Sequence, residues 1–547
     1  MSYFDLGSFH RKFTTESPEA QIWLDRGFSW LFGFNHEEAI VCFERSLASD
    51  KTCVMAYWGI AHAIGPNYNK VWEFFTYKEK INALKQAHAA LDNGKKYYKN
   101  TTEVERAMID ALAERFPTDP NIEDYSPWND AFSECMRSVY SSFPNDLEVT
   151  AIFAEALINR TPWQLWDLKN RIPEEGASTQ EAQEILERAF NLFPKAWEHP
   201  GLLHMYIHLM EMSPTPEKAL LHGDKLVDLV PDSGHLVHMA THIDVLCGDY
   251  QNVVSRNHKA TEVDKKFVDY AGEENFYTVY RVHNLHFKIY GAMFLGQPTP
   301  ALSAAIQLKQ ILPEKVVKMI PELFEAFIPM NLHVMIRFGQ WDKILLEEFP
   351  ENKELYSFTT AMLHYARAIS LANIGKNNEA ESELERFIVS KDKVQADRNV
   401  FNNSCADVLN VAEQMVLGEV HYKSGNIEKG LEHLRQAVRI DDDLLYDEPW
   451  GWMQPTRHAL GALLMDSQKF DEAEDVYRAD LGLDQTLPRA CQHPRNVWSL
   501  HGLNECLQIR GETTEKNHIQ QLLDQALVRA EVVIKSSCYC RSKDITT

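Results

Sequence analysis

Apolar residues recur along this chain at helical spacing, and the helical segments come in pairs. Residues 23–51, WLDRGFSWLFGFNHEEAIVCFERSLASDK, place Gly27 and Trp30 before a turn and Ala39 and Phe43 after it. Spacings of three and four put such residues on one face of a helix. The pattern therefore predicts two helices joined by a short turn, with the small residues where the helices touch.

The same spacing returns in later segments. Three of them carry its small and large apolar positions most completely: HYARAISLANIGKNNEAESELERF with Ala368, Leu371, Gly375, Ala380 and Leu384; QMVLGEVHYKSGNIEKGLEHLRQAV with Gly418, Gly430, Leu434 and Ala437; and RHALGALLMDSQKFDEAEDVYRADL with Leu460, Gly461, Leu464, Ala473 and Tyr477. Asn-Gly or Asp-Gly hairpins between alternating apolar runs are lacking. We therefore expect an all-α fold built from repeated helix pairs.

These segments resemble tetratricopeptide repeats, in which small residues at positions 8, 20 and 27 let two helices approach closely. The resemblance covers most of the chain, with degenerate copies and insertions. Through LGSFHRKFTT, FNHEEAIVCFERSL, HPGLLHMYIH and GHLVHMATHI the chain also resembles poorly characterised fungal and bacterial members of this family. The resemblance implies a helix-turn-helix α-solenoid curled around a central groove or cavity. It also implies that positions 2, 5, 9, 12 and 13 of each first helix face that groove.

We expect one continuous solenoid in three stretches with a tail. Residues 1–150 carry N-terminal repeats with stretched helices, 151–345 carry central repeats, 346–535 carry C-terminal repeats, and 536–547 form a flexible tail. A long connection near residues 159–180 is rich in Trp, Pro and Gly, and long ordered loops are often functional. Trp163 in this connection is a candidate pocket residue or a cap on the edge of the solenoid.

Composition narrows the function classes. The chain has 55 Lys and Arg against 79 Asp and Glu, a formal charge of −24, which disfavours nucleic acid as a partner. An apolar run of about 18 residues is lacking, so we expect no membrane span and a cytoplasmic protein. The nine cysteines show no regular spacing and indicate reduced thiols. Cys538 and Cys540 are candidates for a pair or a metal site, with a frayed tail as the favoured interpretation.

Histidines occupy matching places in two consecutive repeats. His204 and His208 in HPGLLHMYIH stand at positions 5 and 9, and His238 and His242 in GHLVHMATHI repeat those positions one repeat length, about 34 residues, later. Residues four apart share one helical face, and neighbouring helices lie roughly 8–10 Å apart. The spacing therefore predicts one metal site built from two helices, with His286 at position 5 of the next repeat as a further ligand.

Further groove positions suggest a pocket around this site. In the repeat of His286, position 2 is His283 and position 9 is Tyr290. Later repeats place His333 at position 9 and His458 and His501 at position 5. We take Trp163, His283, His333, His458 and His501 as candidate substrate-pocket residues. A lone histidine on such a helix is more often a core or surface residue, so each of these is weaker than the two matched pairs.

The donor set favours transition-metal chemistry. Neutral imidazole suits Cu, Fe, Zn and Ni and disfavours Mg and Ca. A histidine-dominated set favours Cu or non-haem Fe with redox chemistry, with Zn as a further possibility, and spacing leaves one ion or two open. Glu155 and Glu211 are the nearest candidate carboxylates, as ligand, orienting group or base, and Tyr290 is a third candidate catalytic residue. Glycine-rich phosphate loops are lacking, so we expect no nucleotide cofactor.

Two functions remain open at this stage. The favoured one is a cytoplasmic metalloenzyme, an oxidoreductase acting on a small organic substrate in the groove, with a metal-dependent hydrolase or lyase as second choice. The alternative is an adaptor that binds a partner peptide along the groove without catalysis, the common role of the repeat. His, Tyr and Glu at the groove positions, in place of Lys and Arg, favour the enzyme.

Overall fold

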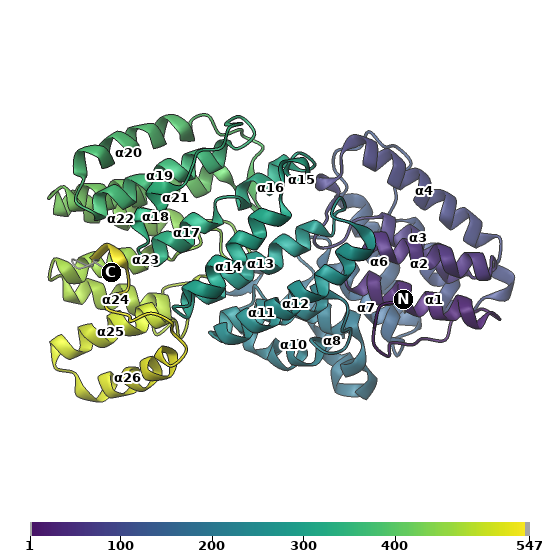
Figure 1. Ribbon diagram of the computed structural model, residues 1–547. Coiled ribbons are helices and arrows are strands. Elements are labelled where there is room, and N and C mark those ends of the chain that lie inside the picture. Colours follow the sequence, from purple (N-terminus) through teal and green to yellow (C-terminus); the bar gives the residue numbers. More distant parts are fainter. Residues whose placement is uncertain (1–2, 542–547) are drawn as a thin grey trace. The chain divides into compact units, whose positions relative to one another are not determined.

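The structure is a computed structural model that describes residues 3–541, and its chain is almost entirely helical (Figure 1). The helices of its first part have these bounds: α1 Pro18–Phe32, α2 His36–Ser49, α3 Val54–Ile64, α4 Tyr77–Lys95, α5 Glu103–Ala113, α6 Ser126–Ser142, α7 Leu147–Ile158, α8 Thr179–Leu192, α9 Pro200–Met210, α10 Leu220–Leu226, α11 Gly234–Cys247 and α12 Tyr250–Ala271. The predicted all-α fold class is confirmed.

The remaining helices continue the series: α13 Thr278–Phe294, α14 Pro298–Ile311, α15 Glu314–Val317, α16 Pro321–Phe324, α17 Met330–Arg337, α18 Trp341–Leu346, α19 Ser357–Asn373, α20 Asn377–Lys391, α21 Cys405–Lys423, α22 Ile427–Asp442, α23 Thr456–Asp466, α24 Phe470–Leu481, α25 Val497–Arg510 and α26 Thr513–Leu527. Two short antiparallel hairpins interrupt them: β1 Trp166–Asp167 pairs with β2 Ile172–Pro173, and β3 Asn399–Val400 pairs with β4 Asn403–Ser404.

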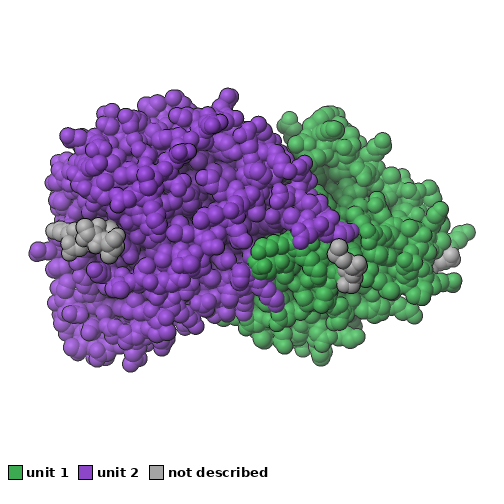
Figure 2. Space-filling view, viewed as in Figure 1, with its two compact units in different colours: residues 1–243, 262–266 green, residues 244–261, 267–547 purple. Residues whose placement is uncertain are grey.

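The chain forms two compact units, shown in green and purple in Figure 2. Unit 1 comprises residues 1–243 and 262–266, and unit 2 comprises residues 244–261 and 267–547. The three-part division of the sequence at 150, 345 and 535 stays a prediction. Along residues 3–541, none of the helices combines the length and apolar character that crossing a membrane requires.

Helix pairs form as the repeat positions predict. Gly27 on α1 lies against Phe43 on α2, and a Cβ at Gly27 would come within 2.5 Å of the Phe43 ring. Gly461 on α23 meets Tyr477 on α24 in the same way, with a Cβ 2.6 Å from the ring. These contacts place position 8 of the first helix against position 24 of the second. The small residue is needed because any side chain there would overlap the partner's ring.

The turn inside several of the pairs contains one left-handed residue. Glycine with positive φ takes this place, position 15 of the repeat, in several pairs: Gly248, Gly296, Gly339, Gly375 and Gly425. Phe34, with φ 55°, takes it in the α1–α2 pair, and Gln468, with φ 60°, takes it in the α23–α24 pair. Asn35 then caps α2 by accepting a hydrogen bond from the Glu38 backbone N–H.

Successive pairs stack on one another within each unit. In unit 2, α19 packs against α20 and α21, α21 packs against α22, and α23 packs against α22 and α24 (Figure 1). In unit 1, α7 packs against α6, α8 and α9, and α1 also contacts α9. The last contact joins segments far apart in the sequence and brings the end of α1 to the histidines of α9.

The C-terminal segment differs from the expected flexible tail. Ser537 is buried: its hydroxyl bonds to the Tyr477 hydroxyl at 2.7 Å and donates to the His458 carbonyl at 2.8 Å. Cys538 and Cys540 form a disulfide, where the sequence favoured a frayed tail with reduced thiols. Residues 536–541 are therefore part of the packed structure of unit 2, because their backbone and hydroxyl groups find buried partners there. Residues 542–547 of the predicted tail lie outside the described residues.

Candidate metal centre

Two helices of unit 1 bring three histidines together. Helix α9 carries His204 and His208, and α11 carries His235 near its start. Pro200 at the first position of α9 and the His199 side chain, which accepts from the Leu202 backbone N–H at 3.2 Å, fix where α9 begins. One ligand nitrogen from each of the three imidazoles lies within 4.8 Å of the others.

Hydrogen bonds fix which ring nitrogens of α9 face this point. The Nδ1–H of His204 donates to the Phe32 carbonyl at 2.6 Å, and the Nδ1–H of His208 donates to Glu211 Oε1 at 2.9 Å. Because both acceptors are oxygens without a proton, each Nδ1 carries the hydrogen and each Nε2 carries a lone pair. Both Nε2 atoms are buried and have no hydrogen-bond partner. Metal-binding histidines are typically held in this way by an outer carbonyl or carboxylate.

Burial keeps these rings neutral. His204 and His208 are fully buried. Burial lowers the pKa of His204 to about 3 and lowers the pKa of His208 well below its ordinary value, because a charged imidazolium loses its hydration there. At neutral pH both rings therefore present uncharged nitrogen lone pairs, the form that binds a metal ion.

Glu211 connects the two predicted histidine pairs. Its Oε1 accepts from His208, and its Oε2 accepts from the Nδ1–H of His242 at 2.7 Å. The Nε2 of His242 in turn lies 2.8 Å from the Nε2 of His238. Glu211 therefore hydrogen-bonds to one histidine on each helix, as an orienting group would.

Aromatic rings enclose the three histidines. The Phe34 ring centroid lies 4.5 Å from that of His204, 5.8 Å from His208 and 5.7 Å from His235. The Tyr68 ring lies 4.5 Å from His208. The turn after α1 therefore contributes twice, through the Phe32 carbonyl and through the Phe34 ring.

Two other predicted residues of unit 1 lie beside different partners. The Glu155 carboxylate is 3.7 Å from His62 Nε2 and accepts from the Asn159 amide at 3.3 Å. Burial raises the pKa of Glu155 to about 7, against the lowering effect of the Arg115 charge. Trp163 is half-buried, and its backbone N–H donates to the Tyr68 hydroxyl at 3.1 Å, so one ring separates it from His208.

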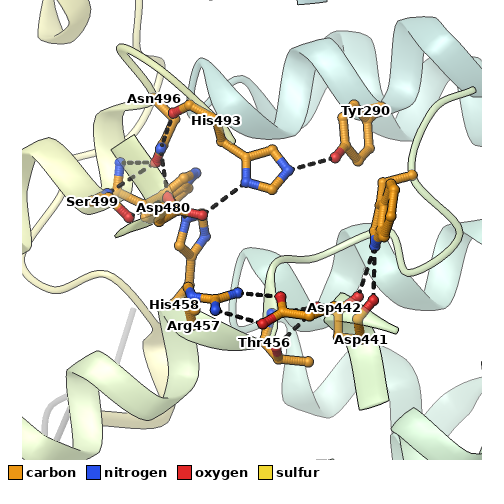
Figure 3. Close-up of polar contacts among 12 residues, drawn as sticks. Tyr290, Asp441, Asp442, Thr456, Arg457, His458, Asp480, His493, Asn496 and Ser499 are labelled. Carbon is orange, nitrogen blue, oxygen red and sulfur yellow. Dashed lines mark hydrogen bonds and ion pairs between the residues drawn. The ribbon is translucent and has the colours of Figure 1, made fainter. Parts of the chain in front are cut away.

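Tyr290 and His458 belong to a buried polar network in unit 2 (Figure 3). The Tyr290 hydroxyl bonds to His493 Nε2 at 3.0 Å, and His493 Nδ1 bonds to Asp480 Oδ1 at 2.8 Å. Asp480 Oδ2 accepts from His458 Nε2 at 3.0 Å and from the Asn496 amide at 2.9 Å. Burial raises the pKa of Asp480, but the adjacent His458 and His493 outweigh it and hold that pKa well below its ordinary value.

The remaining predicted residues also lie in unit 2. His286 is buried with its Nε2 2.7 Å from the Met453 sulfur, His333 is buried against Trp452, and the His283 ring packs against that of Phe401. His501 is half-buried on α25, where burial lowers its pKa. The five-histidine set that includes His286 stays a prediction.

The expectation that positions 5 and 9 line an open groove differs from the structure. His204, His208 and His238 are fully buried and His242 is 2% exposed. The rings of Phe34 and Tyr68, both from loops, pack against the His204 and His208 rings on the face that the repeat pattern directs toward a groove. The spacing of residues along a helix predicts which side of the helix they lie on, but not which other residues pack over that side. The exposure of these histidines could therefore not be inferred from the sequence.

Several residues of these sites are absent from the predicted set. His235 stands at position 2 of its repeat, a groove position, so the repeat count contained the signal for it. The others carry no recognisable signal in sequence, because their partners are distant in the chain: Phe34, Met453, Asp480 and His493.

Comparison with known proteins identifies no family. No protein-family profile matches the chain, and no curated protein matches it. Among solved structures, the P58(IPK) TPR domain is 12% identical with a TM-score of 0.21, covering 93% of this chain and 99% of its own. The human IFIT1 dimer with PPP-AAAA is 14% identical (TM-score 0.28, 95% and 92%), and yeast Tom70 is 11% identical (TM-score 0.29, 93% and 96%). Since identities and TM-scores are this low, the site alone supports a functional proposal.

Proposed function

We propose that this chain is a metal-dependent enzyme whose transition-metal ion is held by His204, His208 and His235. The observation that carries the proposal is the pair of buried, unpartnered Nε2 atoms on His204 and His208. A buried nitrogen without a partner costs free energy, roughly 1–3 kcal/mol, unless something completes it. A metal ion bound to both nitrogens would remove that cost, and the fixed Nδ1 protons already point the lone pairs the right way.

Three protein ligands favour a reactive site over a purely structural one. Structural zinc sites use four protein ligands, whereas catalytic sites keep a position open for water or substrate. When bound, a Cu or Fe ion would supply redox chemistry and a Zn ion would supply Lewis acidity. The chain's own part is to orient His208 and His242 through Glu211 and to exclude water with the Phe34 and Tyr68 rings. Full burial favours a small substrate.

The peptide-adaptor alternative receives less support from this site. Stacked helix pairs commonly bind partners through extended concave surfaces. A peptide would have to contact positions 5 and 9 of the repeats, and His204 and His208 at those positions are fully buried. A protein-binding role would therefore involve other surfaces of the helix array and would leave the histidines unexplained.

Metal analysis of the purified chain tests the proposal. We expect stoichiometric Cu, Fe or Zn by plasma mass spectrometry, lost in a His204→Ala, His208→Ala double variant. His199→Asn is the matched control, because it changes a buried histidine on the same helix while keeping an N-cap residue, and it should retain the metal. Metal-free protein that resists loading with all three ions would contradict the proposal. Protein that binds only Zn would contradict the redox chemistry that Cu or Fe would supply.

A further inference from the structure

His286 of unit 2 makes an unusual contact. Its Nε2 lies 2.7 Å from the sulfur of Met453, 167 residues away in sequence. Sulfur is larger than oxygen, so this approach is tighter than an ordinary N–H···O bond of about 2.9 Å. The thioether is also only a weak hydrogen-bond acceptor. A weak hydrogen bond is therefore a poor explanation for so close a contact.

A second imidazole, that of His333, lies beside the residues that flank this methionine. The residues on both sides of Met453 contact His333: the Trp452 ring centroid is 5.0 Å from that of His333, and the Gln454 amide donates to the His333 carbonyl at 2.6 Å. Burial lowers the pKa of His286, and the proximity of His333 lowers it further. The loop between α22 and α23 thus places Met453 against His286 of α13, and the residues on either side of Met453 against His333 of α17.

These side chains are buried and incompletely partnered. His286, His333 and Met453 are 1%, 2% and 1% exposed. The Nδ1 atoms of both histidines are buried without hydrogen-bond partners. Burial lowers the pKa of His286 to about 3 and that of His333 to about 4, so both rings are neutral. Phe327 and Phe401 lie 5.1 and 6.0 Å from the His286 ring and make the surroundings apolar.

We infer that His286, His333 and Met453 form a second metal site, separate from the centre of unit 1, that binds a soft monovalent cation, Cu(I). Imidazole suits copper, and thioether sulfur is a soft ligand that selects Cu(I) over hard cations. A cation bound by both His286 Nε2 and the sulfur would make ligands of two atoms that already lie close together. Apolar surroundings suit a singly charged ion better than a doubly charged one, because removing the singly charged ion from water costs less free energy.

Anaerobic loading of the full chain with Cu(I) tests the inference. The probe is Cu(I) itself, delivered from its complex with bicinchoninate, whose colour reports the affinity. We expect X-ray absorption of the loaded protein to show both Cu–N and Cu–S scattering. Met453→Leu, which nearly conserves volume, should abolish the Cu–S scattering. It should also weaken Cu(I) binding at least about tenfold, the lower end of what losing even an outer partner of a metal costs. Met362→Leu, another fully buried methionine of unit 2, should retain both properties.

Other variants separate this site from the centre of unit 1. The His204→Ala, His208→Ala variant should keep the Cu–S scattering, so failure of the proposed function would leave this result standing. If Met453→Leu does not fold by circular dichroism, His333→Gln serves in its place and should weaken Cu(I) binding by a similar factor. Wild-type protein without Cu–S scattering, or a folded Met453→Leu protein with unchanged Cu(I) affinity, would overturn the inference.

Discussion

Phe34 shows how one residue can set the backbone and the site together. It holds a left-handed conformation, φ 55°, at the turn position that glycine takes in several other helix pairs. A non-glycine residue there costs roughly 1–2 kcal/mol. Such strain persists where the surroundings compensate it, and it often accompanies function. Here the compensation is the packing of the Phe34 ring against three imidazoles.

Replacing Phe34 with glycine separates these two effects. Phe34→Gly relieves the backbone but removes the ring, whose loss costs about 3–5 kcal/mol in a core. We expect a net loss of about 2–3 kcal/mol in the free energy of unfolding, measured by urea titration, with weaker metal binding. Gln468→Gly is the control, because Gln468 takes the same turn position with an exposed side chain. It should be neutral or stabilising, and equal losses in both variants would contradict our interpretation of the ring.

Glu155 predicts a pH dependence of stability. Its pKa is about 7 in the folded chain because of burial, above its ordinary 4.5. The folded state therefore binds the proton more tightly, and this stabilising contribution is present below pH 4.5 and is lost as pH rises through 7. The loss amounts to up to about 3 kcal/mol. Glu155→Gln removes this titrating group, so the change in unfolding free energy from pH 5 to pH 8 should be more positive in the variant than in the wild type. Urea titrations of both proteins at pH 5 and pH 8 measure this difference. An equal change in unfolding free energy in the two proteins would contradict the prediction.

At the scale of elements, Glu211 holds α9 and α11 in register. It follows the last residue of α9, and its two oxygens accept from a histidine on each helix. A glutamine in its place keeps the shape but can accept with only one oxygen. We expect Glu211→Gln to fold and to lose about 10–100-fold in metal affinity, measured by competition with a coloured chelator. Glu155→Gln, which changes another buried glutamate of unit 1, should leave the affinity unchanged. An unchanged affinity in Glu211→Gln would show that Glu211 does not orient the ligands.

Helix pairs were accessible from sequence because their determinants are local. Gly27 against Phe43 and Gly461 against Tyr477 follow from counting positions within one repeat. The same counting brought His204 and His208 to one face. It did not reveal that this face is buried, because the covering turn at Phe34 lies about 170 residues earlier in the chain.

Long-range pairs escaped prediction for the same reason. Tyr290 was a candidate catalytic residue from its repeat position, and its partner His493 stands 203 residues away. Met453 beside His286 is 167 residues away. A methionine or an aspartate such as Asp480 carries no pattern of its own in a single sequence. Only the packing of helices shows what each one faces.

For the whole molecule, neutral histidines that are buried or half-buried predict sensitivity to acid. Burial lowers the pKa of His36 to about 3, of His62 well below its usual value, and of His458 to about 4. Because these pKa values in the folded state lie below the ordinary 6.5, the unfolded state binds protons more readily. The contribution of these histidines to the free energy of unfolding is therefore fully present above pH 6.5 and is lost as the pH falls below it. Each such group costs about 2 kcal/mol by pH 5. The free energy of unfolding of a protein domain is roughly 5–15 kcal/mol, so losses of this size are large.

We therefore expect helical structure to be lost near pH 5. Circular dichroism measured from pH 7.5 to pH 4 tests this. His36 and His62 lie in unit 1 and His458 in unit 2, so both units should respond. Acidification has the opposite effect on the contribution of Glu155 to stability, but the combined loss from three histidines is larger than the gain from one carboxyl group. Native helical content at pH 4 would contradict the prediction.

The bond from His204 to the Phe32 carbonyl has a consequence for how the protein is made. It joins residues 172 positions apart. At a synthesis rate of roughly 5–20 residues per second, the first helix pair waits about 10–30 s on the ribosome before its histidine partner emerges. The proposed metal centre would therefore form at a late stage of assembly. A chain shortened to begin after residue 50 would keep every histidine of the centre yet lack the turn that orients and covers them.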